Sequence, residues 1–100
     1  MKRRSVVWTL KAAEALDIFC DYIGKDSPSA AKKVKREIIL AAKQLALNPE
    51  LYQLDEFFAG SDQNIRRFFR WSYKVIYQVN EKEVVILDVF HTSSDLSEEE

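Results

Sequence analysis

The chain has 100 residues, of which 47% are hydrophobic and 31% are charged, and its net charge at neutral pH is −1. This length fits one compact domain and leaves no room for two. The near-neutral total excludes a uniformly basic nucleic-acid-binding protein, and the single cysteine, Cys20, excludes an internal disulfide and the usual zinc-binding spacings. No apolar run reaches membrane-spanning length, so we expect a cytoplasmic protein with no cofactor, no metal site and no membrane contact.

The first 24 residues predict a strand followed by a helix. Ser5–Trp8 is short and β-prone, and the hydroxyl of Thr9 is suited to cap the start of a helix. Gly24 is expected to end this helix, because glycine readily adopts the left-handed conformation that often follows a helix. The apolar residues that recur at helical spacing, and so form the predicted buried stripe, are Ala13, Leu16, Cys20 and Ile23.

A second helix follows after a short connection. Ser27 is a suitable capping residue and Pro28 suits the first helical position, while Asn48–Pro49 marks the end of the helix. Because Lys25–Asp26 is so short, the two helices are expected to form an antiparallel hairpin. The predicted buried stripe of this second helix consists of Ala31, Val34, Ile38, Ala41 or Ala42, and Leu45.

The C-terminal half changes to the period of two that is typical of strands. After a predicted loop with a short helical turn at Glu50–Gln63, strands are expected at Ile65–Trp71, Tyr73–Val79 and Val84–Phe90. The polar Asn80–Glu83 connects the last two strands as a hairpin. The last strand is almost entirely apolar, which predicts a central strand covered on both faces.

The order of these elements predicts an α+β fold, β-α-α-β-β-β, with the N-terminal helical hairpin packed on one face of a twisted, largely antiparallel sheet. The helices must cover one face of the sheet because each carries an apolar stripe. The first strand is separated from the others by a long helical crossover, so it can pair in parallel with one of the later three.

A basic and aromatic segment is the most informative feature for function. Residues 63–80 contain no acidic side chain but hold three arginines and a lysine. Strand alternation places Arg66 and Arg70 on one face and Arg67 on the other, and we expect Lys74 to lie near the first two. Such a strip suits a nucleic acid or an acidic protein. The candidate residues for target or nucleic-acid binding are Arg66, Arg70, Lys74, Trp71 and Tyr73.

The alternative is a solvated sheet face whose arginines pair with carboxylates such as Glu81 or Glu83. Another candidate is His91, the only histidine, whose unperturbed pKa is close to neutrality. A single histidine with no partner at diagnostic spacing favours a structural role, in which the ring is hydrogen-bonded to the backbone. The candidate proton partners of His91 are Ser93, Ser94, Asp95 and Tyr77. Asp55–Glu56 is an adjacent carboxylate pair that we expect to face solvent.

An ordered set of short motifs resembles toxins of the RelE/ParE superfamily, which belong to bacterial type II toxin–antitoxin modules of the plasmid-stabilisation type. These motifs are Trp8–Thr9, Asp26–Pro28, Asn64–Arg67, Tyr73–Tyr77 and Val89–His91. They span nearly the whole chain in order. The resemblance implies one toxin domain over residues 1–100, in which residues 94–100 are expected to form a flexible tail. It also implies a cognate antitoxin as partner.

Members of this superfamily act in two ways. ParE-like toxins inhibit DNA gyrase by binding it, without known catalysis. RelE-like toxins are endoribonucleases that cut mRNA on the ribosome. Under the nuclease alternative, the resemblance assigns catalysis to His91, Arg67 and Lys74, with cations stabilising the phosphate as a ribose hydroxyl attacks it.

The sequence departs from the nuclease pattern near its C-terminus. No tyrosine follows Tyr77, and the segment His91–Asp95 lacks the arginine that relatives often carry. These departures favour the ParE-like, non-enzymatic function, and they leave open whether the chain is an enzyme. A further alternative is a degenerate, non-toxic protein that only binds its antitoxin.

Overall fold

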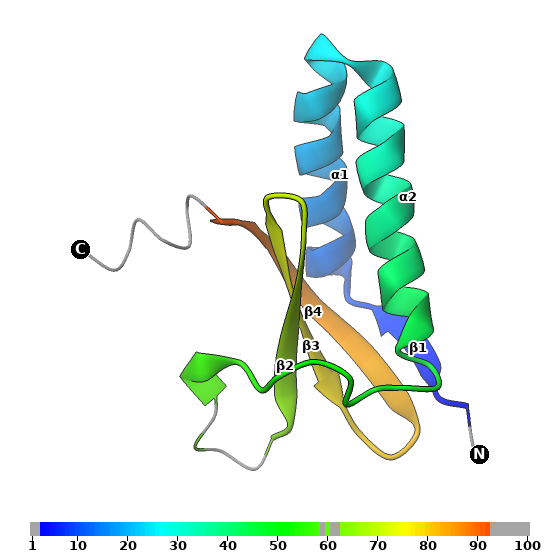
Figure 1. Cartoon of the computed structure of the whole chain (residues 1–100), viewed down its shortest axis with the longest axis vertical. Coiled ribbons are helices and arrows are strands. Elements are labelled where there is room, and N and C mark those ends of the chain that lie inside the picture. Colours follow the sequence, from blue (N-terminus) through cyan, green and yellow to red (C-terminus); the bar gives the residue numbers. More distant parts are fainter. Residues whose placement is uncertain (1–2, 59, 61–62, 93–100) are drawn as a thin grey trace.

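The computed structural model describes residues 3–58, 60 and 63–92 (Figure 1). The elements are β1 (Ser5–Trp8), α1 (Leu10–Asp26), α2 (Pro28–Gln44), a 3-10 turn (Glu56–Phe58), β2 (Ile65–Arg70), β3 (Tyr73–Val79) and β4 (Glu83–His91). This order confirms the predicted α+β fold. The tail expected at residues 94–100 lies outside the described residues.

The four strands form one mixed sheet in the order β1-β4-β3-β2. β1 pairs in parallel with β4, one of the three strands that the crossover allowed, and the other neighbours are antiparallel. The two helices lie side by side over the same face of the sheet (Figure 1). β4 is therefore a central strand, paired with β1 on one side and with β3 on the other. The expected helical cover, however, is present on one face only, and Phe90 remains 36% exposed.

Serine and threonine side chains begin both helices. The Thr9 hydroxyl accepts a hydrogen bond from the Ala12 N–H at 3.0 Å, and the Ser27 hydroxyl accepts one from the Ala30 N–H at 3.2 Å. The Ser27 N–H also donates to the Ile23 carbonyl, so this single residue ends α1 and begins α2. Both predicted caps are confirmed, because each satisfies backbone donors at a helix start.

The prediction that Gly24 ends α1 is wrong. The helix continues through Lys25–Asp26, and Gly24 does not have a positive φ. A Cβ atom at this position would lie 3.6 Å from the Cβ of Ala31, so the glycine lies where α1 and α2 approach closely. The chain leaves the helical conformation at Ser27, so Gly24 does not end the helix. Its small size instead allows the two helices to pack closely.

The core lies between the helices and the sheet. Its largest fully buried side chains include Phe68, Tyr77 and Ile38. In α1 the stripe is centred on Ala12, Leu16 and Cys20, so the predicted Ala13 is displaced by one position and is only half-buried. The buried stripe of α2 consists of Val34, Ile38, Ala41 and Ala42, continued by Leu45, and it agrees with the prediction except at Ala31, which is half-buried.

Two further predictions change at the turns. Trp71, expected inside a strand, instead lies in the β2–β3 turn with a φ of 56°. The Asn80 side chain accepts hydrogen bonds from the Lys82 and Glu83 N–H groups at 3.0 and 2.8 Å, which fixes the predicted β3–β4 hairpin. The predicted loop before β2 contains an isolated bridge between Leu54 and Arg66, so part of it runs along the free edge of β2.

Candidate functional site

The arginines of β2 alternate between the two faces of the sheet, as predicted. Arg66, Phe68 and Arg70 all contact Tyr52 from the loop, on the face that the helices cover. Arg67 lies on the other face, where its guanidinium is 5.4 Å from the Phe69 ring. We call this second surface, which neither α1 nor α2 covers, the outer face of the sheet. The basic segment is therefore split rather than continuous.

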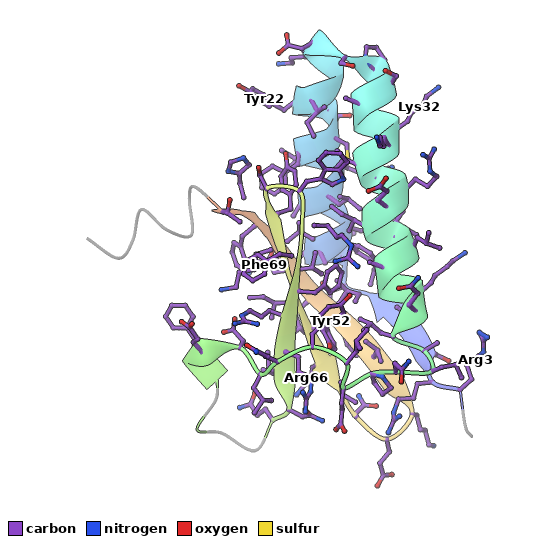
Figure 2. The ribbon with its side chains drawn as sticks, viewed as in Figure 1. Arg3, Tyr22, Lys32, Tyr52, Arg66 and Phe69 are labelled. Carbon is purple, nitrogen blue, oxygen red and sulfur yellow. The ribbon has the colours of Figure 1, made fainter. Side chains whose placement is uncertain are left out.

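Arg66 is engaged within the protein itself. Its Nη1 donates to the Tyr52 carbonyl at 2.7 Å and its Nε donates to Asn64 Oδ1 at 2.9 Å (Figure 2). The Glu50 carboxylate is 3.8 Å from its Nη2, and the side chain is only 17% exposed. The guanidinium thus uses its fork of donors to hold the loop against the edge of β2. Little of it remains available to a partner.

Arg70 is held by stacking as well as by hydrogen bonds. Its Nη2 donates to the Tyr52 hydroxyl at 3.0 Å and its Nη1 to the Phe69 carbonyl at 2.8 Å. The Cζ atom lies 5.5 Å from the Phe68 ring and 5.9 Å from the Tyr52 ring, within the range of cation–π attraction. The residue is half-buried and no carboxylate in the described residues pairs with it, so its charge is not neutralised.

Lys74 does not lie near Arg66 and Arg70, contrary to the expectation. It points to the outer face, between Phe69 on β2 and Phe90 on β4 in the strand register. Its Nζ is 3.2 Å from Asp55 Oδ1, and the two side chains are 7% and 0% exposed. The Phe57 ring lies 5.7 Å from the same Nζ. The lysine charge is therefore neutralised inside the protein.

The prediction that Asp55 faces solvent is also wrong. The Asp55 N–H donates to the Ile65 carbonyl at 2.8 Å, which lays the loop along β2 and carries the carboxylate over Lys74. The other carboxylate oxygen accepts from the Phe57 N–H at 3.1 Å. A buried carboxylate is tolerated because it has both a cation and a backbone donor. Glu56, its neighbour in sequence, is exposed.

His91 lies on the helix-covered face among aromatic rings. Its ring centroid is 5.2 Å from that of Tyr73 and 6.3 Å from that of Phe19. With Ile18 and Tyr22 of α1, these side chains line an open hollow at the end of β4. Tyr73 is 6% exposed, and burial raises the pKa of its hydroxyl.

The residues named as proton partners of His91 are not brought to it within the described chain. The Tyr77 hydroxyl donates to the Pro49 carbonyl at 2.9 Å, and this tyrosine pairs with Ile86, five positions before His91 on β4. Ser93, Ser94 and Asp95 lie outside the described residues. The three residues of the nuclease alternative are divided between the faces, with His91 on the helix side and Arg67 and Lys74 on the outer side.

Trp71 is the most accessible of the candidate binding residues, with 55% of its surface exposed. The Nζ of Lys33 on α2 lies 5.4 Å from its ring centroid. Trp71 therefore joins the tip of the β2–β3 turn to the second helix. Together with the half-buried Arg70, it forms the part of the predicted strip that a partner can reach.

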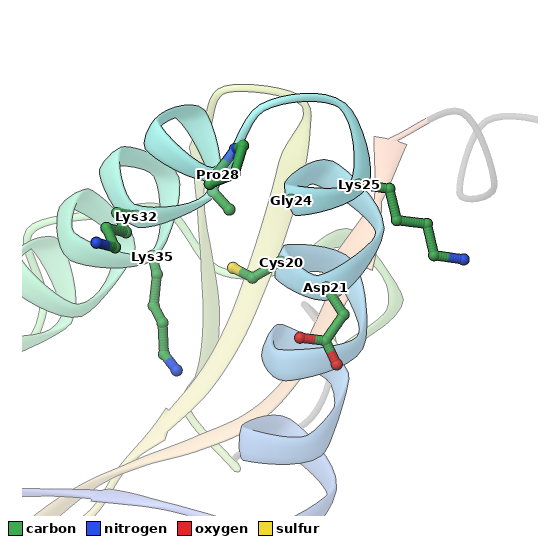
Figure 3. Close-up of a pocket in the computed structure, with 8 residues that line it drawn as sticks. Cys20, Asp21, Gly24, Lys25, Pro28, Lys32 and Lys35 are labelled. Carbon is green, nitrogen blue, oxygen red and sulfur yellow. The ribbon is translucent and has the colours of Figure 1, made fainter.

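Sequence reasoning missed a surface along the helical hairpin. Two hollows lie along the hairpin, and the lysine Lys35 lines both of them. The first lies between α1 and α2 (Figure 3), and the second also includes Val6 and Trp8 of β1. The Lys35 Nζ is 3.0 Å from Asp17 Oδ1, and this hydrogen bond raises the pKa of the lysine. Apolar side chains line both hollows, together with Lys25 and Lys32 in the first and Lys43 in the second. The signal available in the sequence was the set of lysines that lie off the apolar stripe of α2.

The two helices also differ in charge. α1 carries four acidic and two basic side chains, whereas α2 carries five basic side chains and one acidic one. Burial raises the pKa of the Cys20 thiol, which lies under the first hollow. Within the described residues, no group of three or more potential metal ligands comes together. No helix in the same part of the chain is both long and apolar enough to span a bilayer.

Residues 6–96 match the family described as the ParE toxin of the type II toxin–antitoxin system, parDE. The chain belongs to the ParE toxin family. This places it in the superfamily that the sequence motifs indicated. Its fold is similar to a chain from the chromosomal ParDE toxin–antitoxin system of P. aeruginosa, with a TM-score of 0.70 and 26% identity over 89% of this chain and 96% of that one.

A second similar fold occurs in the RelBE2 toxin–antitoxin complex of Mycobacterium tuberculosis. The TM-score is 0.57 and the identity is 21%, over 91% of this chain and 93% of that one. At this level of identity the likeness extends to the fold alone. No curated protein matches the chain. The ParE-type toxin thus shares a backbone arrangement with the RelE-like branch.

Proposed function

We propose that this ParE-type toxin inhibits DNA gyrase by binding it, and that it acts without catalysing a reaction. The observation that carries the proposal is the separation of the candidate catalytic residues. His91 lies on the helix-covered face, while Lys74 lies on the outer face with its charge neutralised by Asp55 at 3.2 Å. A proton carrier must come within hydrogen-bond reach of the group that it serves. Membership of the ParE family supports the same target.

The test is a supercoiling assay with purified gyrase and purified toxin. We expect the toxin to block supercoiling in a dose-dependent manner while leaving ribosome-bound mRNA uncut in a parallel primer-extension assay. Unchanged supercoiling at saturating toxin contradicts the proposal. Cleavage of mRNA that disappears in His91→Ala would establish the endoribonuclease instead. A chain that does neither, and that does not arrest growth on induction, would be the degenerate antitoxin-binding protein.

Trp71 and Arg70 are the residues we assign to gyrase binding, because they remain accessible among the predicted set. Arg66 and Lys74 are engaged internally, and Tyr73 is 6% exposed. Exposed aromatic and arginine side chains are frequent hot spots, and truncating one typically costs about 2 kcal/mol or more of binding energy. Trp71→Ala is therefore expected to weaken gyrase inhibition at least tenfold, since about 1.4 kcal/mol corresponds to tenfold. Phe69→Ala, on the outer face and 46% exposed, is the matched control.

We also propose that a cognate antitoxin neutralises the toxin by binding along the helical hairpin. Both similar structures come from toxin–antitoxin systems, and the hollows along the hairpin are lined by apolar side chains and lysines. A partner segment with acidic side chains suits such a groove. Co-purification with the product of the neighbouring reading frame tests this. Lys32→Glu should weaken the complex, whereas Lys82→Glu, in the distant β3–β4 hairpin, should not.

A further inference from the structure

One short segment contacts every cation of the acid-free stretch at residues 63–80. Residues 50–57, which we call the strap, run along the free edge of β2. The Asp55 N–H donates to the Ile65 carbonyl at 2.8 Å, and the Arg67 N–H donates to the Gln53 carbonyl at 3.2 Å. Side chains or carbonyls of the strap contact all four cations of that stretch, which are Arg66, Arg67, Arg70 and Lys74.

The strap reaches cations on both faces of the sheet. On the helix-covered face, Arg66 donates to the Tyr52 carbonyl at 2.7 Å and Arg70 donates to the Tyr52 hydroxyl at 3.0 Å. On the outer face, the Lys74 Nζ is 3.2 Å from the Asp55 carboxylate. Side chains of a strand alternate between the two faces, so one extended chain can contact both sets only at an edge of the sheet. The edge of β2 is therefore a binding surface for an extended chain, and the strap occupies it.

The strap neutralises only part of the charge along this edge. Its Asp55 carboxylate pairs with Lys74, and its Glu50 carboxylate lies 3.8 Å from Arg66 Nη2. No carboxylate among the described residues forms an ion pair with the other two cations. A more acidic extended chain would therefore find additional charge to pair with, and electrostatic complementarity would favour its binding at the same edge.

The strap is held mainly by polar contacts. Its large apolar side chains Leu51, Leu54 and Phe57 are 56%, 39% and 75% exposed. Tyr52 is the exception, because its ring centroid lies 5.3 Å from that of Phe68. Segments with few buried apolar contacts open at a lower free energy than the core does. The strap can therefore leave the edge of β2 while the helices and the sheet stay folded.

The strap also shows which chemistry this edge accepts. It combines an extended backbone with an aromatic ring at Tyr52 and a carboxylate at Asp55, three residues later. We propose that the strap opens as a unit, and that an extended acidic segment of a protein partner, with the same spacing of ring and carboxylate, then pairs with the edge of β2. Addition of a strand to a free sheet edge is a common mode of peptide recognition. The inference does not rest on gyrase being the target.

Hydrogen exchange in the full chain measures the opening of the strap. The Arg67 amide reports on the strap, and the amides of the central strand β4 report on the core. We expect the Arg67 amide to exchange at least about 100-fold faster than the β4 amides, as amides released by local opening do. Tyr52→Ala should accelerate the Arg67 amide by about tenfold more and leave β4 protected. Leu51→Ala, which truncates an exposed side chain of the strap, is the matched control and should change neither.

A fluorescein-labelled peptide with the sequence of the strap, Glu-Leu-Tyr-Gln-Leu-Asp-Glu-Phe, probes the uncovered edge. The closed strap competes with it, so the apparent affinity falls with the fraction of open molecules. By fluorescence anisotropy, we expect Tyr52→Ala and Asp55→Asn to bind the peptide about tenfold more tightly than the parent, or better, because both increase the open fraction. Glu56→Gln removes the same charge as Asp55→Asn from an exposed neighbour and should bind like the parent. A peptide with Asn in place of Asp should lose the gain, because Lys74 then lacks a carboxylate.

Each of the other outcomes overturns the proposal. Equal exchange of the Arg67 and β4 amides means that the strap leaves the edge only when the whole chain unfolds. An equal gain in Glu56→Gln means that net charge alone determines the affinity. Peptide-induced shifts of amide peaks in the helices, and none in β2, mean that the peptide binds elsewhere. A gain for single-stranded oligothymidylate in place of the peptide means that the edge binds a nucleic acid. None of these results bears on gyrase inhibition, which is measured separately.

Discussion

Phe68 and Phe69 are neighbours on β2, yet the first is 1% exposed and the second is 46% exposed. Strand geometry turns Phe68 toward the helices and Phe69 toward the outer face of the sheet. On the helix side, Phe68 packs between Tyr52 and Tyr77, with ring centroids 5.3 and 6.2 Å away. That side is stabilised mainly by the burial of apolar surface.

The outer face is organised differently. Its centre is the Lys74–Asp55 ion pair, with Phe57 beside it and Phe69 and Phe90 in the neighbouring strand positions. A sequence rich in cations has therefore produced a face on which one cation is hidden and three phenylalanines are exposed. The difference teaches that counting positive residues along a strand does not give the charge of its surface. The loop that covers an edge decides which charges remain available.

The largest contrast is expected between two alanine substitutions. Phe68→Ala should lower the free energy of unfolding by about 3–5 kcal/mol, because it removes a fully buried ring. Phe69→Ala should lower it by less than about 1 kcal/mol, as substitutions of exposed residues usually do. Urea denaturation followed by circular dichroism measures both. Similar losses for the two variants would mean that the outer face is part of the core, and the comparison would fail.

The ion pair provides the second test. Lys74→Met leaves the carboxylate of Asp55, which is 0% exposed, without its cation. Removing one partner of a buried pair typically costs about 3–5 kcal/mol, so we expect a loss of that order in the free energy of unfolding. The double variant Lys74→Met with Asp55→Asn should recover most of the loss, since no buried charge remains. A single variant as stable as the parent would show that water reaches the carboxylate.

The positions of the helices and strands could be predicted from short sequence patterns. Thr9 and Ser27 were predictable as helix caps because each hydroxyl accepts a hydrogen bond from a backbone N–H only three residues later. The alternation of Arg66, Arg67 and Arg70 was equally predictable, because a strand has only two faces. The long helical crossover predicted that β1 can pair in parallel with one of the three later strands, and the structure shows that this strand is β4. The helix caps and the strand alternation each depend on residues close together in the sequence, and the crossover depends only on the order of the elements.

The features that could not be predicted depend on contacts between segments that are distant in the sequence. Asp55 and Lys74 meet because the loop forms backbone hydrogen bonds to β2. No periodic pattern in the sequence predicts such a contact at the edge of a sheet. Gly24 resembles a helix terminator, but its role is set by the approach of Ala31 on the other helix. Trp71 fits the strand period, yet the chain turns there with a positive φ. The candidate site was mispredicted where tertiary contacts decide exposure.

Alkaline pH should destabilise the helix-covered side of the sheet, by a smaller free energy than the substitutions above. Burial raises the pKa of the Tyr77 hydroxyl to about 12, from an ordinary value near 10. The folded state then keeps a proton that the unfolded state loses, so stability decreases as pH rises between these values. The slope is about 1.4 kcal/mol per pH unit, or roughly 3 kcal/mol over the whole interval.

Comparison with Tyr77→Phe isolates this effect from the titration of other side chains. The variant has no ionisable group at position 77, so the difference in unfolding free energy between it and the parent should shift in favour of the variant above pH 10 or so. A difference that stays constant with pH would indicate that Tyr77 titrates normally. The outer face offers no buried tyrosine among the described residues, so no comparable effect is expected from it.

The smallest expected effect lies at the edge of β2, where the loop meets the helix-covered face. The Tyr52 hydroxyl accepts a hydrogen bond from Arg70 Nη2 at 3.0 Å while its ring packs on Phe68. Tyr52→Phe keeps the ring and removes the acceptor, so we expect a loss of about 1 kcal/mol in the free energy of unfolding. Arg70→Ala in the Tyr52→Phe background should then cost less than in the parent, because the shared bond is already gone. Strictly additive losses would show that the bond to Tyr52 contributes nothing to the position of Arg70, and that the Nη2 donors are available to a partner.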